Sequence, residues 1–276
     1  MADEEHVNAV RAYMEVHHMV TEKIKIQSID LGPTKKRSEA LDEVALDEPV
    51  CIFVNGEYHV TLIATPELKK ELAVGYLLSG GILGSVDDIA SIETRNSDVL
   101  VETRGRVDLR GAMVDMMNLI VTACSASPRV DSKKSRLPRV ESDMRVRADT
   151  LKTMIAELNR RSSVHMRTRG THAAMLCSED GETLVFAEDV GRHNALDKVV
   201  GDYSLRGGDP GECVLLSTGR QSGEMVQKAA RAGIPVVCSM TVPLVSGIRL
   251  AEAAGITLAS LSVRKLKVYT CPERIL

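Results

Sequence analysis

The stretch that decides the fold of this chain reads 213-CVLLSTGRQSGEM-225, a short apolar run followed by a glycine-containing turn and a polar helix start. It predicts a strand over residues 213–217 and a helix over residues 222–232. The turn between them offers backbone N–H groups and an arginine, which together suit a phosphate group. The predicted phosphate contact consists of Thr218, Gly219, Arg220, Gln221 and Ser222. The alternative is a structural turn that only caps the helix.

The same alternation of strand and helix patterns extends on both sides of this stretch. The further predicted strands cover residues 173–177, 184–188, 236–239 and 257–261, and the further helices cover residues 150–161, 194–201 and 246–254. Such alternation predicts an α/β fold with an open, partly parallel sheet flanked by helices. Ligands of these sheets gather where strands end and helices begin.

The N-terminal part follows a different pattern, which predicts a smaller α+β domain. Two apolar runs joined by Asn55-Gly56 predict a hairpin, since Asn-Gly readily adopts positive φ. Thr65-Pro66 opens a predicted helix that ends before Gly80, and two more strands are predicted at residues 89–94 and 99–103.

We therefore divide the chain into three predicted units. Residues 1–45 have no clear period and form a peripheral, partly ordered leader. Residues 46–120 form the small α+β domain. Residues 121–276 form the α/β domain.

Composition excludes several classes of protein. The 276 residues are 44% apolar and 26% charged with a net charge of -3, which is typical of a globular protein without a global attraction to nucleic acid. Aromatic residues make up only 3%, so a stacking surface for nucleic acid is not expected. No apolar run approaches the roughly 20 residues that span a bilayer, and the polar N-terminus is unlike a signal peptide. We expect a cytoplasmic protein with no membrane partner.

The six cysteines are spread singly, without a CxxC pair. This spacing fits a reducing compartment and predicts neither a disulfide framework nor a structural metal site. Apolar strand-like runs contain Cys51, Cys177, Cys213 and Cys238, which we assign to the core, whereas Cys271 remains unassigned.

Cys124 has a different setting, in the sequence 121-VTACSASP-128 among small residues. A charged segment with an excess of basic residues follows at 128–139, and its low hydrophobicity predicts a mobile loop. Nearby positive charge lowers the pKa of a thiol towards the nucleophilic thiolate. Cys124 is therefore the predicted catalytic residue, the alternative being a buried and inert cysteine.

Two further polar clusters follow predicted strands or begin them, 171-THAA-174 and 188-EDVGRHNALDK-198. Burial of these polar side chains is costly without partners, so they predict a supporting network beside the turn. Its members are His172, Asp189, Arg192, His193 and Asp197. The alternative is an intrahelical polar face, because His193 and Asp197 lie one helical turn apart.

These motifs together resemble the FdhD/NarQ family, the accessory sulfurtransferases of formate dehydrogenase. The resemblance covers residues 45–272 and includes Asn55-Gly56, 64-ATP-66, 71-ELAVGYLL-78, 170-GTHAA-174, 188-EDVGRHNALDK-198, 217-STGRQSGEM-225 and 268-VYT-270. It implies a cytidine-deaminase-like α/β domain after a smaller α+β domain, and a homodimer.

The resemblance also implies a mechanism. A cysteine desulfurase passes sulfur to Cys124 as a persulfide, which sulfurates the molybdenum or tungsten bis(molybdopterin guanine dinucleotide) cofactor that formate dehydrogenase uses. That guanine-containing cofactor is a transient ligand. The family's dinucleotide-contact segment corresponds to Leu261, Ser262, Val263, Arg264, Lys265 and Leu266, one residue shorter here and without the usual aromatic.

One departure from the family pattern concerns the second cysteine. The family shows SCGxCG, whereas Ser127 stands here where the second thiol would be. An internal disulfide exit is then impossible, so an external thiol or the metal has to complete the exchange. The family's TGG is likewise altered, to 168-TRG-170.

Two rival functions follow from these features. A zinc hydrolase of the deaminase type needs a His-x-Glu and a Pro-Cys-x-x-Cys, and neither is present, since His172 precedes two alanines. A non-covalent chaperone that holds the dinucleotide and docks it to formate dehydrogenase is the stronger rival, because the second cysteine is missing. Replacing Cys124 separates this rival from sulfur transfer.

Overall fold

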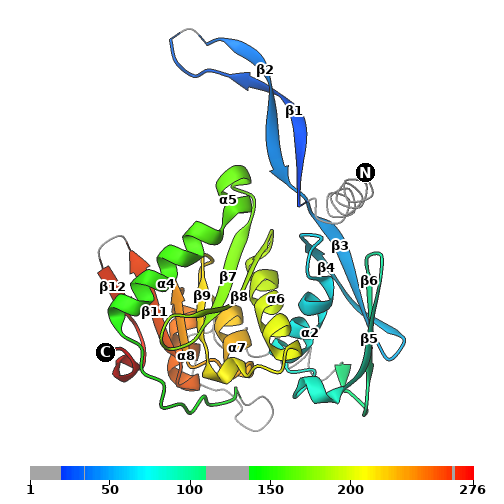
Figure 1. Ribbon diagram of the computed structural model, residues 1–276, viewed down its shortest axis with the longest axis vertical. Helices are drawn as coiled ribbons and strands as arrows, with labels where there is room; N and C mark the ends of the chain where they lie inside the picture. Colours follow the sequence, from blue (N-terminus) through cyan, green and yellow to red (C-terminus); the bar gives the residue numbers. More distant parts are fainter. Residues whose placement is uncertain (1–19, 34, 110–136, 263–264) are drawn as a thin grey trace, which may run out of the picture.

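The computed structural model describes residues 20–33, 35–109, 137–262 and 265–276, whose strands form three separate sheets. A two-stranded ribbon extends away from the body, which contains a four-stranded and a six-stranded sheet (Figure 1). Helices lie between and around the two larger sheets. The α/β class predicted from the sequence is confirmed.

The N-terminal sheet has the strand order β4-β3-β6-β5. Its strands are β3 (Glu48–Val54), β4 (Glu57–Ala64), β5 (Ile89–Arg95) and β6 (Asp98–Thr103), with the 3-10 turn η1 (Val86–Asp88) before β5. The predicted hairpin is confirmed, and Asn55 and Gly56 have the positive φ values that its turn requires. One face packs on helix α2 (Lys69–Ser79) through buried Ile52, Val101 and Leu77.

Helix α2 begins at Lys69, four residues later than the predicted start at Thr65. The N–H and hydroxyl groups of Thr65 donate instead to the Asp189 carboxylate, 124 residues further along the chain. Leu68 then has left-handed backbone angles, φ 56° and ψ 39°, which set the turn into the helix. A distant carboxylate has therefore replaced the local cap.

The C-terminal sheet has the order β12-β11-β10-β9-β7-β8. Its strands are β7 (His172–Cys177), β8 (Thr183–Asp189), β9 (Val214–Ser217), β10 (Val236–Ser239), β11 (Thr257–Ser262) and β12 (Lys265–Val268). The central strands β9, β10 and β11 are parallel, and the other pairings are antiparallel. The predicted partly parallel sheet is confirmed, with β12 as an additional edge strand.

Helices cover both faces of this sheet. They are α4 (Ala148–Arg161), α5 (Ser163–Thr168), α6 (Arg192–Leu205), α7 (Gly223–Arg231) and α8 (Val245–Ala254), with the short turns η2 (Pro210–Glu212) and η3 (Pro272–Arg274). Apolar side chains of α6, α7 and α8 fill one core, and those of α4 fill the core on the opposite face. The predicted helices are all present, and the short α5 was not predicted.

Three of the cysteines assigned to the core are fully buried in it, Cys177, Cys213 and Cys238. Burial raises the pKa of Cys177 to about 11 and the pKa of Cys213 and Cys238 to about 12, so these thiols stay protonated at neutral pH. Cys51 is only half-buried, with its sulfur 3.4 Å from the Thr61 hydroxyl, so its assignment to the core is wrong.

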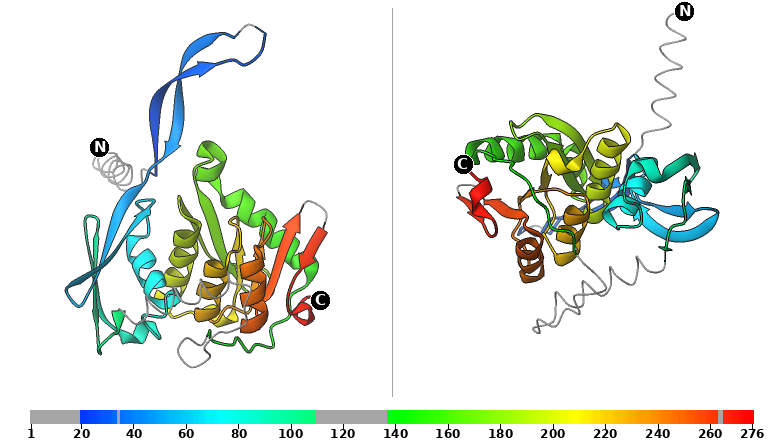
Figure 2. Two further views of the ribbon diagram at one scale, coloured as in Figure 1. Left: turned by 180° about the vertical axis from the view of Figure 1, so that it is seen from behind. Right: turned by 90° about the horizontal axis from the view of Figure 1, so that it is seen from below.

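The ribbon is formed by β1 (Thr21–Ile29) and β2 (Arg37–Ala45), which pair antiparallel over nine positions. The predicted leader therefore contains a regular two-stranded ribbon at these residues, which the sequence pattern did not predict. Nearly all of their side chains are exposed, so the strands do not show the apolar-inward alternation by which a strand is recognised. The ribbon projects from the body in both side views (Figures 1 and 2).

Candidate functional site

Strand direction brings three polar segments to the same end of the C-terminal sheet, where several strands end. We call this end of the sheet the polar edge. Strands β8, β9 and β10 end at this edge, and β7 starts there, because it is antiparallel to both β8 and β9. His172 on β7 is therefore paired with Asp189 on β8. Two residues further along β7, Ala174 is paired with Ser217 on β9. All three predicted clusters contribute to this polar edge.

The turn after β9 is held rigid by its own hydrogen bonds. The Thr218 hydroxyl accepts from Ala173 N at 2.9 Å and lies 3.4 Å from His172 Nδ1. The carbonyl of Gly219 accepts from Gln221 Nε2 and from the Ser239 hydroxyl, both at 2.8 Å. These hydrogen bonds fix the backbone of the turn, while the buried oxygens Gln221 Oε1 and Ser222 Oγ have no hydrogen-bond partner among the described residues.

Few backbone donors of the turn remain for an anion. Thr218, Gly219 and Ser222 already donate their N–H groups within the protein. Within the described part of the chain, the turn's N–H groups at Arg220 and Gln221 lack such partners. The predicted anion contact therefore narrows to these two residues, of which Arg220 is exposed and Gln221 is buried.

Gly219 allows the close approach of Arg192. A Cβ atom at position 219 would lie 2.8 Å from Arg192 Cβ, closer than van der Waals contact permits. Arg192 is the first residue of α6, so the glycine brings the start of α6 against the turn. Two arginines, Arg192 and Arg220, thereby flank the same edge.

Two histidines of the edge are held neutral. Burial, with the positive charges of Arg192 and Lys228, lowers the pKa of His193 to about 4. Burial and Arg192 also lower the pKa of His172. The contact of 3.1 Å between His193 Nε2 and Glu224 Oε2 is therefore between a neutral imidazole and a carboxylate at pH 7.

Asp189 holds the two larger sheets together. Its fully buried carboxylate accepts from Thr65, Gly191 and Asn194 and pairs with Lys198 Nζ at 2.7 Å. Burial lowers the pKa of Lys198, which the Asp189 charge opposes. With five donors around it, Asp189 has no capacity left for a ligand.

Asp197 makes a second contact along the same joint, near the C-terminal end of α2. It accepts from the Ser79 hydroxyl at 2.5 Å and pairs with Lys228 Nζ at 2.8 Å, which also lies over the Tyr76 ring. Burial raises the pKa of Asp197, and Lys228 opposes this shift. The structure therefore places His172, Arg192 and His193 at the edge, and Asp197 away from it.

The predicted dinucleotide segment lies beside a hollow next to this edge. The hollow has a volume of about 480 Å³ and is lined by Leu261, Ser262, Met240 and the α4 residues Lys152, Ile155, Ala156 and Asn159. Lys265 and Leu266 begin β12, where they pair with Ser262 and Leu261. Val263, Arg264, Cys124 and most of the basic segment after it lie outside the described residues.

Sequence reasoning missed two polar residues of the edge. Glu224 lies within the motif 217-STGRQSGEM-225, but its contact with His193 joins helix α7 to helix α6, so the motif alone does not indicate it. Ser239 ends β10 and supports the Gly219 carbonyl. Its position at the end of a predicted strand was the available signal.

Two searches of the described residues gave negative findings. No group of three His, Cys, Asp or Glu side chains among them could hold a metal ion. In the same part of the chain, no helix is both long and apolar enough to cross a membrane.

The fold is that of an α/β protein whose polar edge lies at the place where open parallel sheets commonly bind their ligands. The chain belongs to the FdhD/NarQ family, whose model matches residues 45–276. The resemblance seen in the sequence motifs is thus confirmed.

Relatives are similar over most of the chain. The sulfur carrier protein FdhD of Thermoplasma acidophilum is 32% identical, covering 95% of this chain and 97% of that protein. The protein of the same name from Mycobacterium bovis is 36% identical, covering 85% of this chain and 92% of its own. The crystal structure of a protein assigned as a formate dehydrogenase accessory protein, from Desulfotalea psychrophila, is similar with a TM-score of 0.73 at 27% identity, covering 92% and 99% of the two chains.

Proposed function

We propose that this chain is a cytoplasmic sulfurtransferase that carries sulfur on Cys124 to the molybdenum or tungsten bis(molybdopterin guanine dinucleotide) of formate dehydrogenase. The observation that carries the proposal is its similarity, over 95% and 85% of the chain, to two proteins named sulfur carrier protein FdhD. A similar structure has been assigned as a formate dehydrogenase accessory protein. A homodimer, as the family implies, is part of the proposal.

The proposed sulfur transfer has two steps, the first onto Cys124 and the second from Cys124 to the cofactor. The Cys124 thiolate attacks the terminal sulfur of a desulfurase persulfide, which forms the Cys124 persulfide and releases the desulfurase thiolate. Release of that sulfur as a sulfide ligand consumes two electrons. An external thiol supplies them by forming a disulfide with Cys124, or the metal supplies them and Cys124 returns to the thiolate.

The polar edge supports binding of an anionic nucleotide. Arg220 and the N–H groups of the turn suit a diphosphate, while the hollow beside Leu261 and Ser262 has room for an attached ring. The neutral state of His172 and His193 leaves the arginines as the positive charges of the edge. The proposed roles are anion contact for the turn and ring contact for the hollow.

A non-covalent chaperone of the same cofactor is the alternative. Ser127, where the family has its second cysteine, is the observation that favours it. Such a chaperone needs only the binding edge and the docking step, and not the Cys124 sulfur.

The two functions differ in what a Cys124→Ala variant does. We would measure its affinity for GDP, which presents the guanine nucleotide part of the cofactor, and its ability to activate formate dehydrogenase. Sulfur transfer predicts unchanged GDP affinity with loss of activation, and the chaperone predicts that both are kept. Cys51→Ala, on the N-terminal sheet, is the matched control and should keep both.

A further inference from the structure

The ribbon of β1 and β2 has neither a covering element nor a third strand. Among the described residues, each of the two strands pairs only with the other. An isolated two-stranded ribbon is marginally stable in water, and its outer edges present unpaired N–H and C=O groups. Such an element is typical of a surface that another molecule completes.

The two faces of the ribbon differ in charge. Directly paired residues share a face, so the register assigns one face to Glu22 with Val44, Ile24 with Asp42, Ile26 with Ala40 and Ser28 with Ser38. This acidic–apolar face has two carboxylates and no lysine or arginine. The opposite face has mixed charge, with Lys23, Lys25, Arg37, Glu39 and Glu43.

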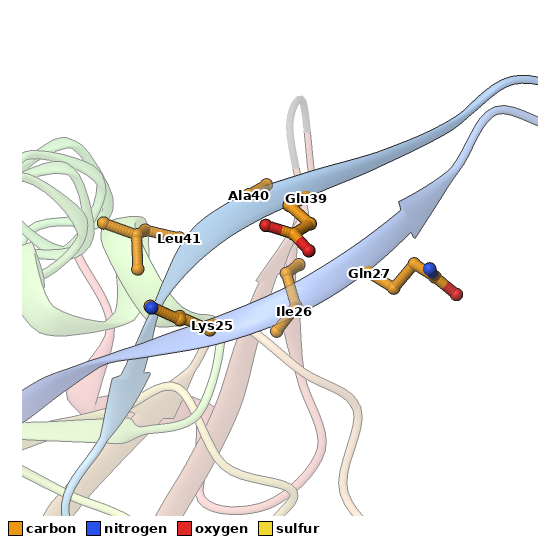
Figure 3. A pocket seen from close by; sticks show the side chains of 6 residues that line it. All are labelled: Lys25, Ile26, Gln27, Glu39, Ala40 and Leu41. Atoms are coloured by element: carbon orange, nitrogen blue, oxygen red, sulfur yellow. The ribbon is translucent and has the colours of Figure 1, made fainter.

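Large aliphatic side chains of the acidic–apolar face are open to solvent. Ile24 is 40% exposed, Ile26 is 37% exposed and Val44 is 44% exposed. A hollow of about 530 Å³ beside the ribbon is lined by Ile26 and Ala40 of this face, but mainly by Lys25, Gln27, Glu39 and Leu41 of the opposite face (Figure 3). The acidic–apolar face is therefore characterised by its exposed aliphatic side chains, and such side chains gathered on one face favour a protein partner.

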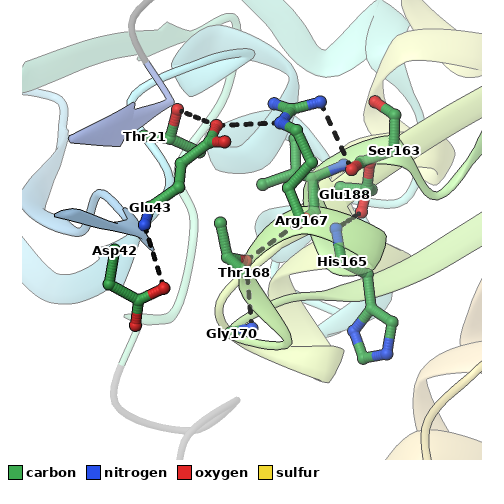
Figure 4. A network of polar contacts seen from close by, with 10 residues as sticks. Thr21, Asp42, Glu43, Ser163, His165, Arg167, Thr168, Gly170 and Glu188 are labelled. Atoms are coloured by element: carbon green, nitrogen blue, oxygen red, sulfur yellow. Dashed lines mark hydrogen bonds and ion pairs between the residues drawn. The ribbon is translucent and has the colours of Figure 1, made fainter. Parts of the chain in front are cut away.

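The mixed-charge face is the one fixed to the body. At the base of the ribbon, the Glu43 carboxylate accepts from Thr21 Oγ1 and from Arg167 Nε, both at 2.8 Å (Figure 4). Arg167 belongs to α5, so this bond ties β2 to the C-terminal domain. The acidic–apolar face is thereby left open for a partner.

The same base connects the ribbon with the polar edge. Glu188 accepts from the N–H groups of Val164 and His165 at the start of α5 (Figure 4). It also accepts from the Thr171 hydroxyl at 3.0 Å. Thr171 directly precedes His172 of the edge. These hydrogen bonds connect the base of the ribbon to the polar edge. A partner bound to the ribbon would therefore have a fixed position relative to that edge.

Charge decides between the possible occupants. A second copy of the same face would bring the Glu22 and Asp42 carboxylates of both copies together, which is unfavourable. The N-terminal residues 1–19 of this chain include four acidic residues and one arginine, so they are no better matched. A complementary surface has apolar side chains between lysines or arginines.

We propose that the acidic–apolar face of the ribbon docks a partner protein through an apolar strand or surface bearing lysine or arginine side chains. This interaction is independent of the sulfur chemistry, because no residue of the polar edge takes part in it. A strand laid along the ribbon would complete its backbone hydrogen bonds and bury Ile24, Ile26 and Val44.

A pair of peptides tests this chemistry on the full chain. One fluorescent peptide alternates lysine with valine, and its twin has glutamate in place of lysine. We expect the basic peptide to bind at least about tenfold more tightly by fluorescence anisotropy, since only it matches the acidic face. Equal binding of the two peptides, or binding of neither, would overturn the proposal.

Variants locate the binding. Ile24→Ser with Ile26→Ser, and separately Asp42→Lys, should each weaken basic-peptide binding about tenfold, whereas Ile29→Ser, at an exposed position on the opposite face, should not. Circular dichroism shows whether each variant is folded. If the Ile24→Ser with Ile26→Ser variant and the Asp42→Lys variant bind the basic peptide as tightly as the wild type, the assignment of the face is wrong.

Sedimentation and cross-linking test the other occupants. Conversion of a dimer to a monomer by Ile24→Ser with Ile26→Ser would mean that a second copy occupies the face. A cross-link from Ile26→Cys to residues 1–19 of the same chain would mean that this segment does. Either result overturns the proposal.

Discussion

Gly75 of α2 lies against Gly201 of α6 where the two helices cross. A Cβ atom at position 75 would stand 1.7 Å from the Asp197 carbonyl oxygen, and one at position 201 would stand 1.9 Å from the Glu71 carbonyl oxygen. The two buried pairs, Lys198 with Asp189 and Lys228 with Asp197, lie along the same joint. This joint holds the N-terminal sheet on the C-terminal domain.

Gly201→Ala should destabilise the protein by about 1–3 kcal/mol, because the added methyl group meets backbone that cannot move aside. Urea unfolding measures this difference. Gly105→Ala, at an exposed position with open space around it, is the matched control. An unfolding midpoint for Gly201→Ala equal to that of the control would contradict the close crossing.

Asp189→Asn should cost about 3 kcal/mol or more, because it leaves the Lys198 ammonium buried without its counter-charge. Thermal or urea unfolding measures the loss. The control is Glu93→Gln, which breaks the exposed pair with Arg95 and should leave the unfolding midpoint unchanged. Equal midpoints for the two variants would show that Asp189 does not hold the joint.

The pH dependence of stability should report His193. Its pKa is about 4 in the folded protein and near 6.5 in the unfolded chain, so between these values the unfolded state binds more protons. Stability is therefore full above pH 6.5 and falls as the pH drops towards 4. His193→Gln should flatten part of this slope, and the lowered pKa values of His172 and His59 contribute to the rest. An NMR titration midpoint of His193 near 6.5 would be the contrary result.

Gly219→Ala should weaken GDP binding about tenfold, because its methyl group displaces Arg192 from the turn. Isothermal titration calorimetry measures the affinity. Gly105→Ala again serves as the control and should bind like the wild type. An unchanged affinity for Gly219→Ala would remove the turn from the nucleotide site.

Sequence patterns predicted the C-terminal sheet closely. Strand β10 has the predicted bounds, and β9 and β11 differ from prediction by one residue at one end. These strands are buried on both faces, so their apolar runs stand out between polar turns. The ribbon and β12 were missed because their exposed side chains leave no such run.

The sequence predicted which residues form the candidate site better than it predicted what each residue does there. Strand ends gave the turn, His172, Arg192 and His193. The roles of Asp189 and Asp197 depend on Thr65 and Ser79, which lie 124 and 118 positions away in sequence. No local pattern carries such a partnership, so only the folded chain shows that these carboxylates act as joints.

The most direct test of sulfur carriage is intact-protein mass spectrometry after incubation with a cysteine desulfurase and cysteine. Wild type should gain a reducible mass of about one sulfur atom (~32 Da), the signature of a persulfide, and Cys124→Ala should not. No gain in wild type would contradict sulfur carriage and leave the non-covalent chaperone. An equal gain in both proteins would place the sulfur on another cysteine.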